Sequence, residues 1–357
     1  MSSSSPRDAR AVTSASTGRC ALQDESNMLH WARMAESTQW AFPAALQPTP
    51  EQVDFDLDAA LQSVVMVHAE IPQDAFTAPV LGTERIGSGV VISSDGLVLT
   101  IGYLITEASS IWLTTGSGGV VPGHALAYDQ TTGFGLVLPL GRLDVPALQR
   151  GSSGALDIGD DAIVIGHGGL PHSLNAKIIA RREFAGYWEY LLDEALFTAP
   201  PHPQWGGTAL LGLDGRLLGI GSLLVQESVS GETFDANMFV PIDLLEPILD
   251  DMVQLGQPAS SPRPWLGLYA TEVQGRLVVG GLAQGGPAHR AGVRLGDFVI
   301  EVAGQPVGNL AELFRRIWSI GPAGSDIPLT LSRGEAPRRV RVHSANRNDF
   351  LMKPLRH

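Results

Sequence analysis

Gly87-Ser-Gly-Val-Val-Ile92 is followed by the turn Ser94-Asp95-Gly96 and by Leu97-Val-Leu-Thr100. The apolar, β-branched residues of the two runs predict strands, and the Asp-Gly turn predicts that these strands pair as a hairpin. Similar runs recur at close spacing, at residues 63–68, 111–115, 135–138, 162–165, 209–211 and 217–225. Many short strands with few helical periods predict a mostly β fold, either a barrel or a sandwich.

A second unit follows this β-rich region. One helical stretch, Pro241 to Leu255, closes the first region, and Gly256 to Arg263 has the Pro- and Ser-rich composition of a linker. Beyond it the pattern mixes strands and helices. We expect strands at residues 265–270, 276–280, 298–302, 327–331 and 339–343, and helices at residues 288–291 and 309–320. In the last helix Leu310, Leu313, Phe314 and Ile317 recur at helical spacing, with Asn309 as N-cap.

The charge of the chain divides in the same way. Among 357 residues, 24 basic and 37 acidic side chains give 24 − 37 = −13. Residues 51–262 carry 26 acidic and 7 basic side chains (7 − 26 = −19), whereas residues 264–345 carry 6 and 9 (9 − 6 = +3). The acidic balance excludes a nucleic-acid scaffold, which needs clustered basic residues. It also predicts that the first unit attracts a basic protein partner.

The N-terminal residues predict little fixed structure. Residues 1–55 read as a flexible leader, Ser-rich at first and with one short amphipathic helix around Met28 to Ala35. No basic start precedes an apolar core, so we expect a cytoplasmic protein, or a periplasmic one if the start codon is misassigned. No apolar run is long enough for a membrane span. The single cysteine, Cys20, predicts no disulfide and no metal site, and nothing in the sequence calls for a cofactor.

Further motifs occur in a fixed order along the chain. Gly206-Gly207 precedes Leu210-Leu-Gly-Leu-Asp-Gly-Arg-Leu-Leu-Gly-Ile220, and Gly286-Pro-Ala-His-Arg-Ala-Gly-Val293 precedes Leu295-Gly-Asp-Phe-Val-Ile-Glu-Val-Ala-Gly-Gln-Pro-Val307. Together with Gly87–Thr100 and Pro264-Trp-Leu-Gly-Leu268, they resemble the HtrA (DegP, Do-like) family of trypsin-like serine proteases over about residues 60–345. The resemblance implies a trypsin-like double β-barrel at 56–255, a linker at 256–263, an α+β PDZ domain at 264–345 and a tail at 346–357. It also implies homo-oligomers.

The catalytic positions of that family are all replaced in this chain. The resemblance aligns the family's histidine with Tyr103 in Leu99-Thr-Ile-Gly-Tyr-Leu-Ile105, and its aspartate with Gly133. The nucleophilic serine aligns with Trp205 in Pro203-Gln-Trp-Gly-Gly207. Loss of the nucleophile or base alone typically costs about a million-fold in kcat. The sequence therefore predicts a pseudoprotease that acts as a scaffold or regulator.

The alternative is an active serine-type endopeptidase with displaced catalytic residues. Hydroxyls are offered by Thr208, Ser222 and Ser88, and imidazoles by His167 and His202. A nucleophile and a base must lie within hydrogen-bonding distance, which sequence alone does not reveal. There is no His-Glu-x-x-His pattern, so a zinc enzyme is not predicted.

The segment Glu183-Phe-Ala-Gly-Tyr-Trp-Glu-Tyr-Leu-Leu-Asp-Glu194 mixes aromatic and acidic residues. One interpretation is a surface that holds an Arg- or Lys-bearing partner by stacking and charge. The other interpretation, which we favour, is that the aromatic side chains fill the degenerate cleft or form a subunit contact.

The PDZ-like unit predicts binding of peptide C-termini. The turn Leu266-Gly267-Leu268 can direct backbone N–H groups toward a terminal carboxylate, and the strand that follows offers an edge for an added strand. The helix beginning at Asn309 forms the other wall of this groove. The expected peptide-binding residues are therefore Leu266, Gly267, Leu268, Tyr269, Ala270, Leu313 and Ile317. The alternative is a purely structural domain whose groove is filled internally.

Overall fold

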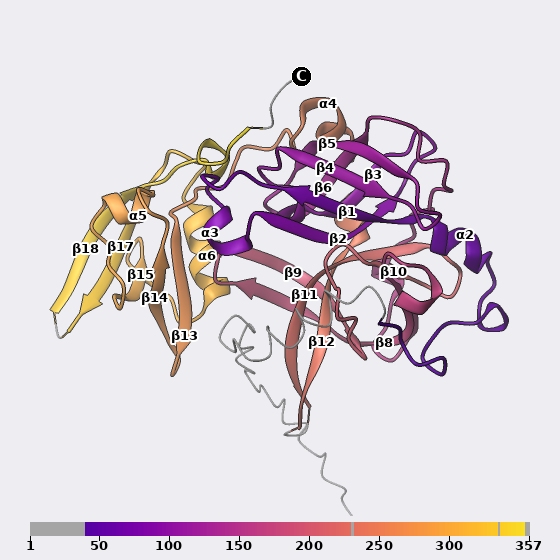
Figure 1. Cartoon of the computed structure of the whole chain (residues 1–357). Helices are drawn as coiled ribbons and strands as arrows, with labels where there is room; N and C mark the ends of the chain where they lie inside the picture. The colour runs from indigo at the N-terminus through magenta and orange to yellow at the C-terminus, as the bar shows by residue number, and fades with distance from the viewer. Residues whose placement is uncertain (1–39, 230–231, 335, 354–357) are drawn as a thin grey trace, which may run out of the picture.

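A computed structural model describes residues 40–229, 232–334 and 336–353. It contains two β-barrels, with a third β-rich unit beside them (Figure 1). The mostly β fold expected from the sequence is confirmed. The helix predicted around Met28 to Ala35 and the single cysteine, Cys20, lie outside the described residues.

Barrel 1 is a closed six-stranded antiparallel barrel in the order β1-β2-β3-β6-β5-β4. Its strands are β1 (Val64–Glu70), β2 (Glu84–Val91), β3 (Val98–Ile101), β4 (Ser110–Thr114), β5 (Val120–Tyr128) and β6 (Phe134–Pro139). The Gly-x-Gly run of β2 has a packing reason, because a Cβ on Gly89 would lie 2.5 Å from the Val98 side chain and 2.8 Å from that of Val67. The glycine thus lets buried valines of neighbouring strands meet inside the barrel.

Barrel 2 is closed in the order β10-β11-β12-β9-β8-β7. Its strands are β7 (Asp161–Ile165), β8 (Ser173–Gly186), β9 (Tyr190–Ala199), β10 (Ala209–Leu211), β11 (Leu217–Val229) and β12 (Glu232–Pro241). The long β8 and β9 pair up to Gly186 and Tyr190, so the segment 183–194 is the end of a hairpin. We call residues 183–194 the β8–β9 tip.

The C-terminal domain is a sheet in the order β13-β14-β15-β17-β18, with β16 beside β15. Its elements are β13 (Leu268–Val273), β14 (Arg276–Leu282), α5 (Pro287–Arg290), β15 (Phe298–Val302), β16 (Gln305–Pro306), α6 (Leu310–Ser319), β17 (Asp326–Arg333) and β18 (Ala336–His343). Asn309 caps α6, since its side chain accepts the Glu312 N–H at 2.8 Å. Leu310, Leu313, Phe314 and Ile317 are buried on one face, as their spacing predicts.

Two predicted elements differ in the structure. The helix expected over Pro241–Leu255 is broken into η6 (Ile242–Leu244) and α4 (Leu249–Leu255), because Pro247 lacks an N–H and disfavours helical backbone in the residue before it. The strand expected to start at Trp265 starts instead at Leu268, because Gly267 turns the chain with a left-handed φ of +66°.

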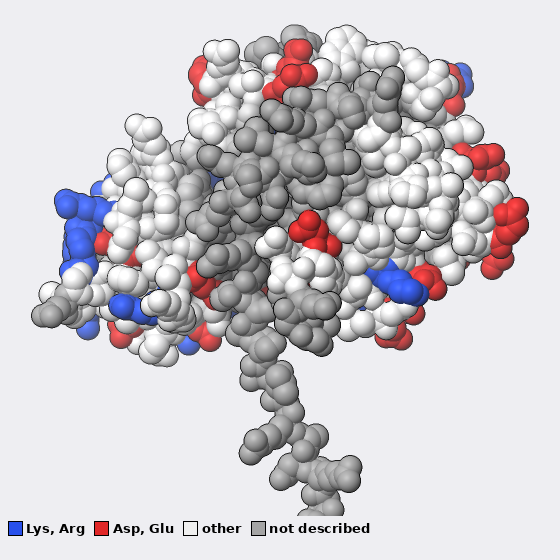
Figure 2. Space-filling view, turned by 60° about the horizontal axis from the view of Figure 1, so that its bottom comes forward, with Lys and Arg blue, Asp and Glu red and all other residues white. Residues whose placement is uncertain are grey.

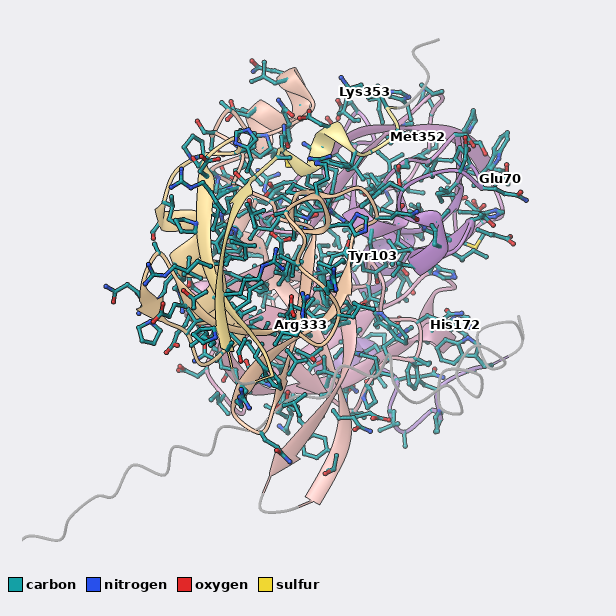
Figure 3. All side chains as sticks on the ribbon, turned by 90° about the vertical axis from the view of Figure 1, so that its left-hand side faces the viewer. Glu70, Tyr103, His172, Arg333, Met352 and Lys353 are labelled. Carbon is teal, nitrogen blue, oxygen red and sulfur yellow. The ribbon has the colours of Figure 1, made fainter. Side chains whose placement is uncertain are left out.

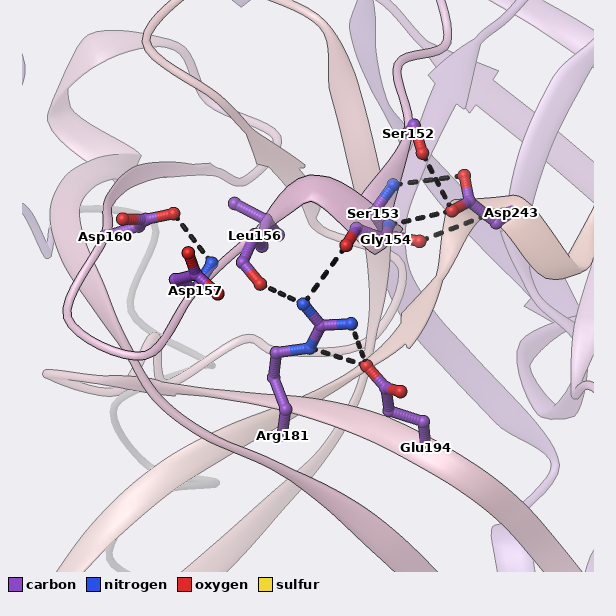
Figure 4. A network of polar contacts seen from close by, with 9 residues as sticks. All are labelled: Ser152, Ser153, Gly154, Leu156, Asp157, Asp160, Arg181, Glu194 and Asp243. Atoms are coloured by element: carbon purple, nitrogen blue, oxygen red, sulfur yellow. Dashed lines mark hydrogen bonds and ion pairs between the residues drawn. The ribbon is translucent and has the colours of Figure 1, made fainter.

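Short helical elements cover the barrel ends and the chain ends. They are η2 (Pro50–Gln52), α2 (Leu57–Gln62), α3 (Ala78–Leu81), η3 (Gly102–Leu104), η4 (Ser153–Ala155), η5 (Leu170–His172) and η7 (Arg347–Asp349). At one end of barrel 2, Asp243 accepts N–H groups of Ser153 and Gly154 at 3.0 and 2.8 Å (Figure 4). Nearby, Arg181 of β8 pairs with Glu194 of β9 and donates to the Leu156 carbonyl. These contacts fix the β8–β9 hairpin to the body of the barrel.

A buried arginine organises one end of barrel 1. Arg85 of β2 is only 4% exposed, and its guanidinium donates to the carbonyls of Tyr103 (2.6 Å) and Thr106 (3.0 Å) and to the Thr77 hydroxyl (2.8 Å). Burial lowers the pKa of Arg85 to about 10, against the opposing effect of the Glu107 carboxylate, so the side chain stays charged at neutral pH. Arg85 therefore holds the turn that carries Tyr103.

The chain returns from the C-terminal domain to the same place. Glu107, also buried, accepts the N–H groups of Thr77 (2.7 Å) and Met352 (2.8 Å). The Phe350 ring lies 4.7 Å from the Trp265 ring, so the tail contacts both barrel 1 and the start of the C-terminal domain. The buried pair Arg85 and Glu107 thereby connects three parts of the chain.

We predict that Arg85→Met lowers the free energy of unfolding by about 3–5 kcal/mol, because it leaves the buried Glu107 carboxylate uncompensated and two carbonyls unpartnered. Urea unfolding followed by tryptophan fluorescence measures this loss. The matched control is Arg142→Met, since Arg142 is 89% exposed in its pair with Asp144 and should change stability by less than about 1 kcal/mol. Equal losses in the two variants would show that the buried network does not stabilise the fold.

Candidate functional site

Tyr103 lies in η3, at the position where the resemblance places the catalytic base. Its phenol donates a hydrogen bond to the Ser222 carbonyl of β11 at 2.9 Å. Burial raises the pKa of the Tyr103 phenol above its usual value, and a hydrogen-bonding contact with Trp205 opposes this rise only in part. The proton is thus kept by the phenol and directed at a backbone carbonyl. Tyr103 is arranged as a structural donor and not as a base.

The Trp205 turn lies directly beside Tyr103. A Cβ on Gly206 would lie 2.8 Å from the Tyr103 hydroxyl oxygen, so the two segments are in contact. The Trp205 carbonyl accepts the hydroxyl of Thr208 at 3.0 Å, which closes the turn. An indole has no nucleophilic atom for acyl transfer. The position expected for the nucleophile therefore carries a bulky, non-reactive side chain.

Gly133 lies on the other side of the Tyr103 turn. Its carbonyl accepts the Gly102 N–H at 2.7 Å, and its φ of +87° is left-handed. A Cβ there would lie 3.2 Å from the Tyr190 hydroxyl oxygen. The Asp129 carboxylate, which lies close in sequence, accepts the Thr132 N–H at 2.9 Å and caps its own turn. It does not reach an imidazole.

The structure thus brings Tyr103, Gly133 and Trp205 together where the two barrels meet. Figure 3 shows Tyr103 toward the middle of the molecule and His172 nearer its rim. A phenol, a left-handed glycine and an indole supply no nucleophile, no general base and no orienting carboxylate. These three residues therefore do not form a catalytic triad.

Ser88 and His167, two of the candidates from the sequence, form a hydroxyl–imidazole pair. The sequence analysis did not predict that these two residues meet. The Ser88 hydroxyl lies 3.0 Å from His167 Nδ1 and accepts the His167 backbone N–H at 3.0 Å. Burial lowers the pKa of His167 to about 4, and the charge of the nearby His172 contributes less to this shift. The ring is therefore neutral. Ser88, however, has no exposed surface, and its hydroxyl cannot reach a substrate carbonyl.

The other histidines build an aromatic cluster. His172 stacks on Trp40 with ring centroids 4.2 Å apart, and its ring nitrogens face the carbonyls of His167 and Trp40. His202 is fully buried; Nε2–H donates to the His172 carbonyl at 3.0 Å, and Nδ1 accepts the Gln204 N–H at 3.0 Å. These partners occupy both ring nitrogens of His202. It joins two loops and is not available as a base.

The remaining hydroxyl candidates are buried. Thr208 has no exposed surface and its hydroxyl donates to the Trp205 carbonyl, and Ser222 is 5% exposed, with its backbone carbonyl accepting from Tyr103. Within the described ranges, no group of three or more His, Cys, Asp or Glu side chains could hold a metal ion. No described helix is long and apolar enough to cross a membrane.

The expected peptide-binding turn of the C-terminal domain is occupied. The Glu189 carboxylate, from the β8–β9 tip, accepts the Leu266 N–H at 3.0 and 3.2 Å and the Leu268 N–H at 3.0 Å. Burial raises the pKa of Glu189 to about 7, while N–H groups of Leu266, Leu268 and Gly267 and the charge of Arg347 oppose this rise. Glu189 has a left-handed φ of +61°, which turns its side chain off the hairpin.

The β8–β9 tip makes two further contacts with the same domain. Leu191 belongs to the apolar core of that domain, together with Leu268, Leu313 and Ile317. Arg315 of α6 pairs with Glu183 at 2.5 Å and with Asp193. The acidic–aromatic segment therefore holds an arginine, as one interpretation of the sequence expected, but this arginine comes from the same chain.

The other predicted peptide-binding residues have mixed surroundings. Ala270, Leu313 and Ile317 are buried, and Tyr269 is half-buried with its ring 6.2 Å from that of Tyr187. The strand β13 pairs only with β14, so its other edge carries no added strand among the described residues. Sequence reasoning assigned no role to Arg315 and did not place Glu189 at this turn. The only sequence signal for either contact was the acidic character of the segment.

We predict that the stability of the chain falls as the pH drops below about 6.5. Burial lowers the pKa of His202 from its usual value of about 6.5 to about 3. As the pH falls below 6.5, the unfolded chain is therefore protonated at His202 while the folded chain is not, and the folded state loses stability until the pH reaches about 3. This one group should contribute a slope of about 1.4 kcal/mol per pH unit, which His202→Gln removes. Urea unfolding at pH 7.5, 6.0 and 5.0 measures the slope.

The control is Asn237→Ala, which removes the bonds that Asn237 makes to the backbone of His202 (2.6 and 3.2 Å). This variant should be less stable at every pH and keep the slope of the unsubstituted protein. A slope that is identical in His202→Gln and the unsubstituted protein would exclude His202 as the titrating group.

Comparisons with known proteins agree with this geometry. Residues 87–220 match the model of a trypsin-like peptidase domain, and residues 278–333 match that of a PDZ domain. An HtrA-type protease solved with a tripeptide superposes with a TM-score of 0.51 at 20% identity, covering 84% of this chain and 97% of its own. The same type of protease solved with a decapeptide gives a TM-score of 0.50 at 18% identity, covering 84% and 98%. These likenesses show the fold.

Curated relatives point to the same family. A protein of Halomonas elongata named "Probable periplasmic serine endoprotease DegP-like" is 29% identical over 270 residues, which are 72% of this chain and 56% of the relative. A protein of the same name from Pseudomonas fulva is 24% identical over 272 residues, with 72% and 55% covered. The chain thus spans slightly more than half the length of these relatives. It is a homologue of the HtrA/DegP-like serine endoproteases and contains a trypsin-like peptidase domain followed by a PDZ domain.

Proposed function

We propose that this chain is a proteolytically inactive HtrA-like protein that binds peptide or protein C-termini through its PDZ domain, as a scaffold or regulator. The observation that carries the proposal is the Tyr103 phenol, which donates to the Ser222 carbonyl at the position of the catalytic base. The position aligned with the family's aspartate is Gly133, which has no side chain, and the position aligned with its serine is Trp205, whose indole is not a nucleophile. The relatives are named as endoproteases, so the loss of activity is proposed for this chain alone.

The alternative, an active serine-type endopeptidase, has one observation in its favour. Ser88 and His167 lie 3.0 Å apart, which is the distance between a nucleophile and its base. Against it, Ser88 is fully buried, and its hydroxyl already accepts the His167 backbone N–H. Because a nucleophile must reach the substrate carbonyl, this pair supports a structural role.

The PDZ domain supports the binding half of the proposal. Its turn at Leu266–Leu268 presents backbone N–H groups to a carboxylate, as the bonds to Glu189 demonstrate. The edge of β13 carries no other strand among the described residues, so an extended peptide can add to it. Recognition of this kind uses main-chain groups and needs no catalytic residue.

Further partners and the location stay predictions. Acidic side chains are spread over the barrels, while basic ones gather at the outer edge of the PDZ domain, where β18 carries Arg338, Arg339 and Arg341 (Figure 2). A basic partner of the barrels should bind more weakly as salt is added. The names of the relatives favour the periplasm, and the cytoplasmic expectation gains no support from them. Homo-oligomers stay an expectation from the family.

We predict that a fluorophosphonate probe does not label the protein, because the hydroxyls of Ser88, Thr208 and Ser222 at the barrel junction are buried, as far as the described residues show. Intact-mass spectrometry after incubation with the probe measures labelling, and trypsin treated in parallel confirms that the probe is reactive. Stoichiometric labelling that peptide mapping assigns to Ser88, Thr208 or Ser222 would establish the rebuilt peptidase instead.

We also predict that peptides selected from a C-terminal library by the full chain require a free terminal carboxylate. The backbone N–H groups of Leu266 and Leu268 donate to a carboxylate, and a C-terminal amide offers them no negatively charged acceptor. Fluorescence polarisation compares each selected peptide with its C-terminal amide. If no binder emerges, or if amides bind as well as acids, the PDZ domain is structural and the proposed function fails.

A further inference from the structure

We propose that the β8–β9 tip is a built-in ligand of the PDZ domain, with the Glu189 carboxylate in the place of a peptide's C-terminal carboxylate, and that external peptides bind by displacing it. This inference rests on the proposed function, because it concerns the same turn. It adds a competing occupant from the chain itself and defines the class of peptide that can replace it.

The first step is the carboxylate. Both Glu189 oxygens accept the Leu266 N–H, at 3.2 and 3.0 Å, and one of them also accepts the Leu268 N–H at 3.0 Å. Glu189 is 6% exposed, so water does not compete for these bonds. A main-chain α-carboxylate offers the same two oxygens to the same N–H groups. The turn cannot hold Glu189 and a peptide terminus at once.

The second step is the apolar contact. Leu191, two residues after Glu189, is 7% exposed and packs in the core cluster of the PDZ domain with Leu268, Leu313 and Ile317. A peptide whose last side chain is apolar offers the same combination of a carboxylate and a nearby apolar group. The tip therefore presents both recognition elements from one β-hairpin.

The third step is charge. Arg315, on the α6 wall, pairs with Glu183 at 2.5 Å and with Asp193 on the two strands of the tip. When the tip leaves, Arg315 loses both partners and becomes available to an acidic side chain of the incoming peptide. The external ligand that fits best therefore has a free carboxylate, an apolar last residue and an acidic residue upstream.

The contact is also of a kind that can be displaced. Because burial raises the pKa of Glu189 to about 7, holding its charged form in this site is costly. The ion pairs of Arg315 are half-exposed, and such pairs contribute little to stability. The tip has one advantage over an external peptide, because it belongs to the same chain. A ligand attached in this way acts at an effective concentration in the millimolar range.

The test uses the full chain and two amide signals. Trp-Leu occurs twice in the sequence, at Trp112-Leu113 and Trp265-Leu266. Labelling with carbonyl-¹³C tryptophan and ¹⁵N leucine therefore selects the amides of Leu113, in barrel 1, and Leu266, in the PDZ turn. The probe is N-acetyl-leucine, a minimal C-terminus, and N-acetyl-leucinamide is its uncharged control.

In the unsubstituted protein, we expect millimolar N-acetyl-leucine to shift neither amide, because Glu189 occupies the turn. In Glu189→Ala the Leu266 amide should shift saturably while the Leu113 amide stays, and the leucinamide should shift neither. The matched control is Glu194→Ala, which also removes a carboxylate from the tip. Glu194 pairs with Arg181 of barrel 2 and not with the PDZ turn, so this variant should behave as the unsubstituted protein. The Leu113 signal reports that each variant is folded.

The inference is overturned if the Leu266 amide responds equally in the unsubstituted protein and Glu189→Ala, or if it does not respond in a folded Glu189→Ala. A second measurement separates it from the proposed function. Peptides from the C-terminal library should bind Glu189→Ala about tenfold or more tightly than the unsubstituted protein. Equal binding to both would support peptide recognition and reject the built-in ligand. A response to N-acetyl-leucine without any library binder would support the built-in ligand and reject the proposed function.

Discussion

The close approach of Ser88 to Gly206 and Gly207 fixes how the two barrels meet. The Ser88 N–H donates to the Gly206 carbonyl at 2.8 Å, and a Cβ on Gly207 would lie only 1.8 Å from the Ser88 carbonyl oxygen. Only glycine permits this contact, and its φ of +78° is one that glycine adopts readily. The contact sets the Trp205 turn against Tyr103 through main-chain packing. Because it uses backbone groups, the constraint does not depend on which side chains stand at positions 103, 133 and 205.

The sequence predicted the parts of the molecule that local patterns encode. Runs of β-branched residues gave most strands, and the Gly-rich motifs located the Tyr103, Gly133 and Trp205 positions that the structure brings together. Contacts between distant segments were not predictable. Glu189 meets Leu266 77 residues further on, and no local pattern records that partner. The Ser88–His167 bond, between residues 79 apart, was missed for the same reason.

The PDZ domain is attached to both barrels through chemically different contacts. Barrel 2 contacts it through the buried Glu189 carboxylate, the Leu191 side chain, the ring contact of Tyr187 with Tyr269 and two ion pairs of Arg315. Barrel 1 contacts it through the C-terminal tail, where Arg347 donates to the Tyr128 hydroxyl at 3.2 Å and Phe350 packs on Trp265. The tail reaches Trp265, the residue before the peptide-binding turn, and the charge of Arg347 acts on the Glu189 carboxyl. The tail does not use the Leu266 and Leu268 N–H groups that hold Glu189.

A ligand that displaces the tip must also act on barrel 2, because thermodynamic coupling is reciprocal. The tip is the end of β8 and β9, two of the six strands of that barrel, and Arg182 of β8 pairs with Glu227 of β11. Glu189 and Leu191 lie beyond the point where Arg181 and Glu194 fasten the hairpin, and Tyr190 between them donates to the Thr132 carbonyl at 2.6 Å. Displacement of these two side chains therefore acts on a segment that contacts both barrels. The Ser222 carbonyl of β11, in the same barrel, accepts the hydrogen bond of Tyr103. A change in barrel 2 therefore also bears on the junction where Tyr103, Gly133 and Trp205 lie.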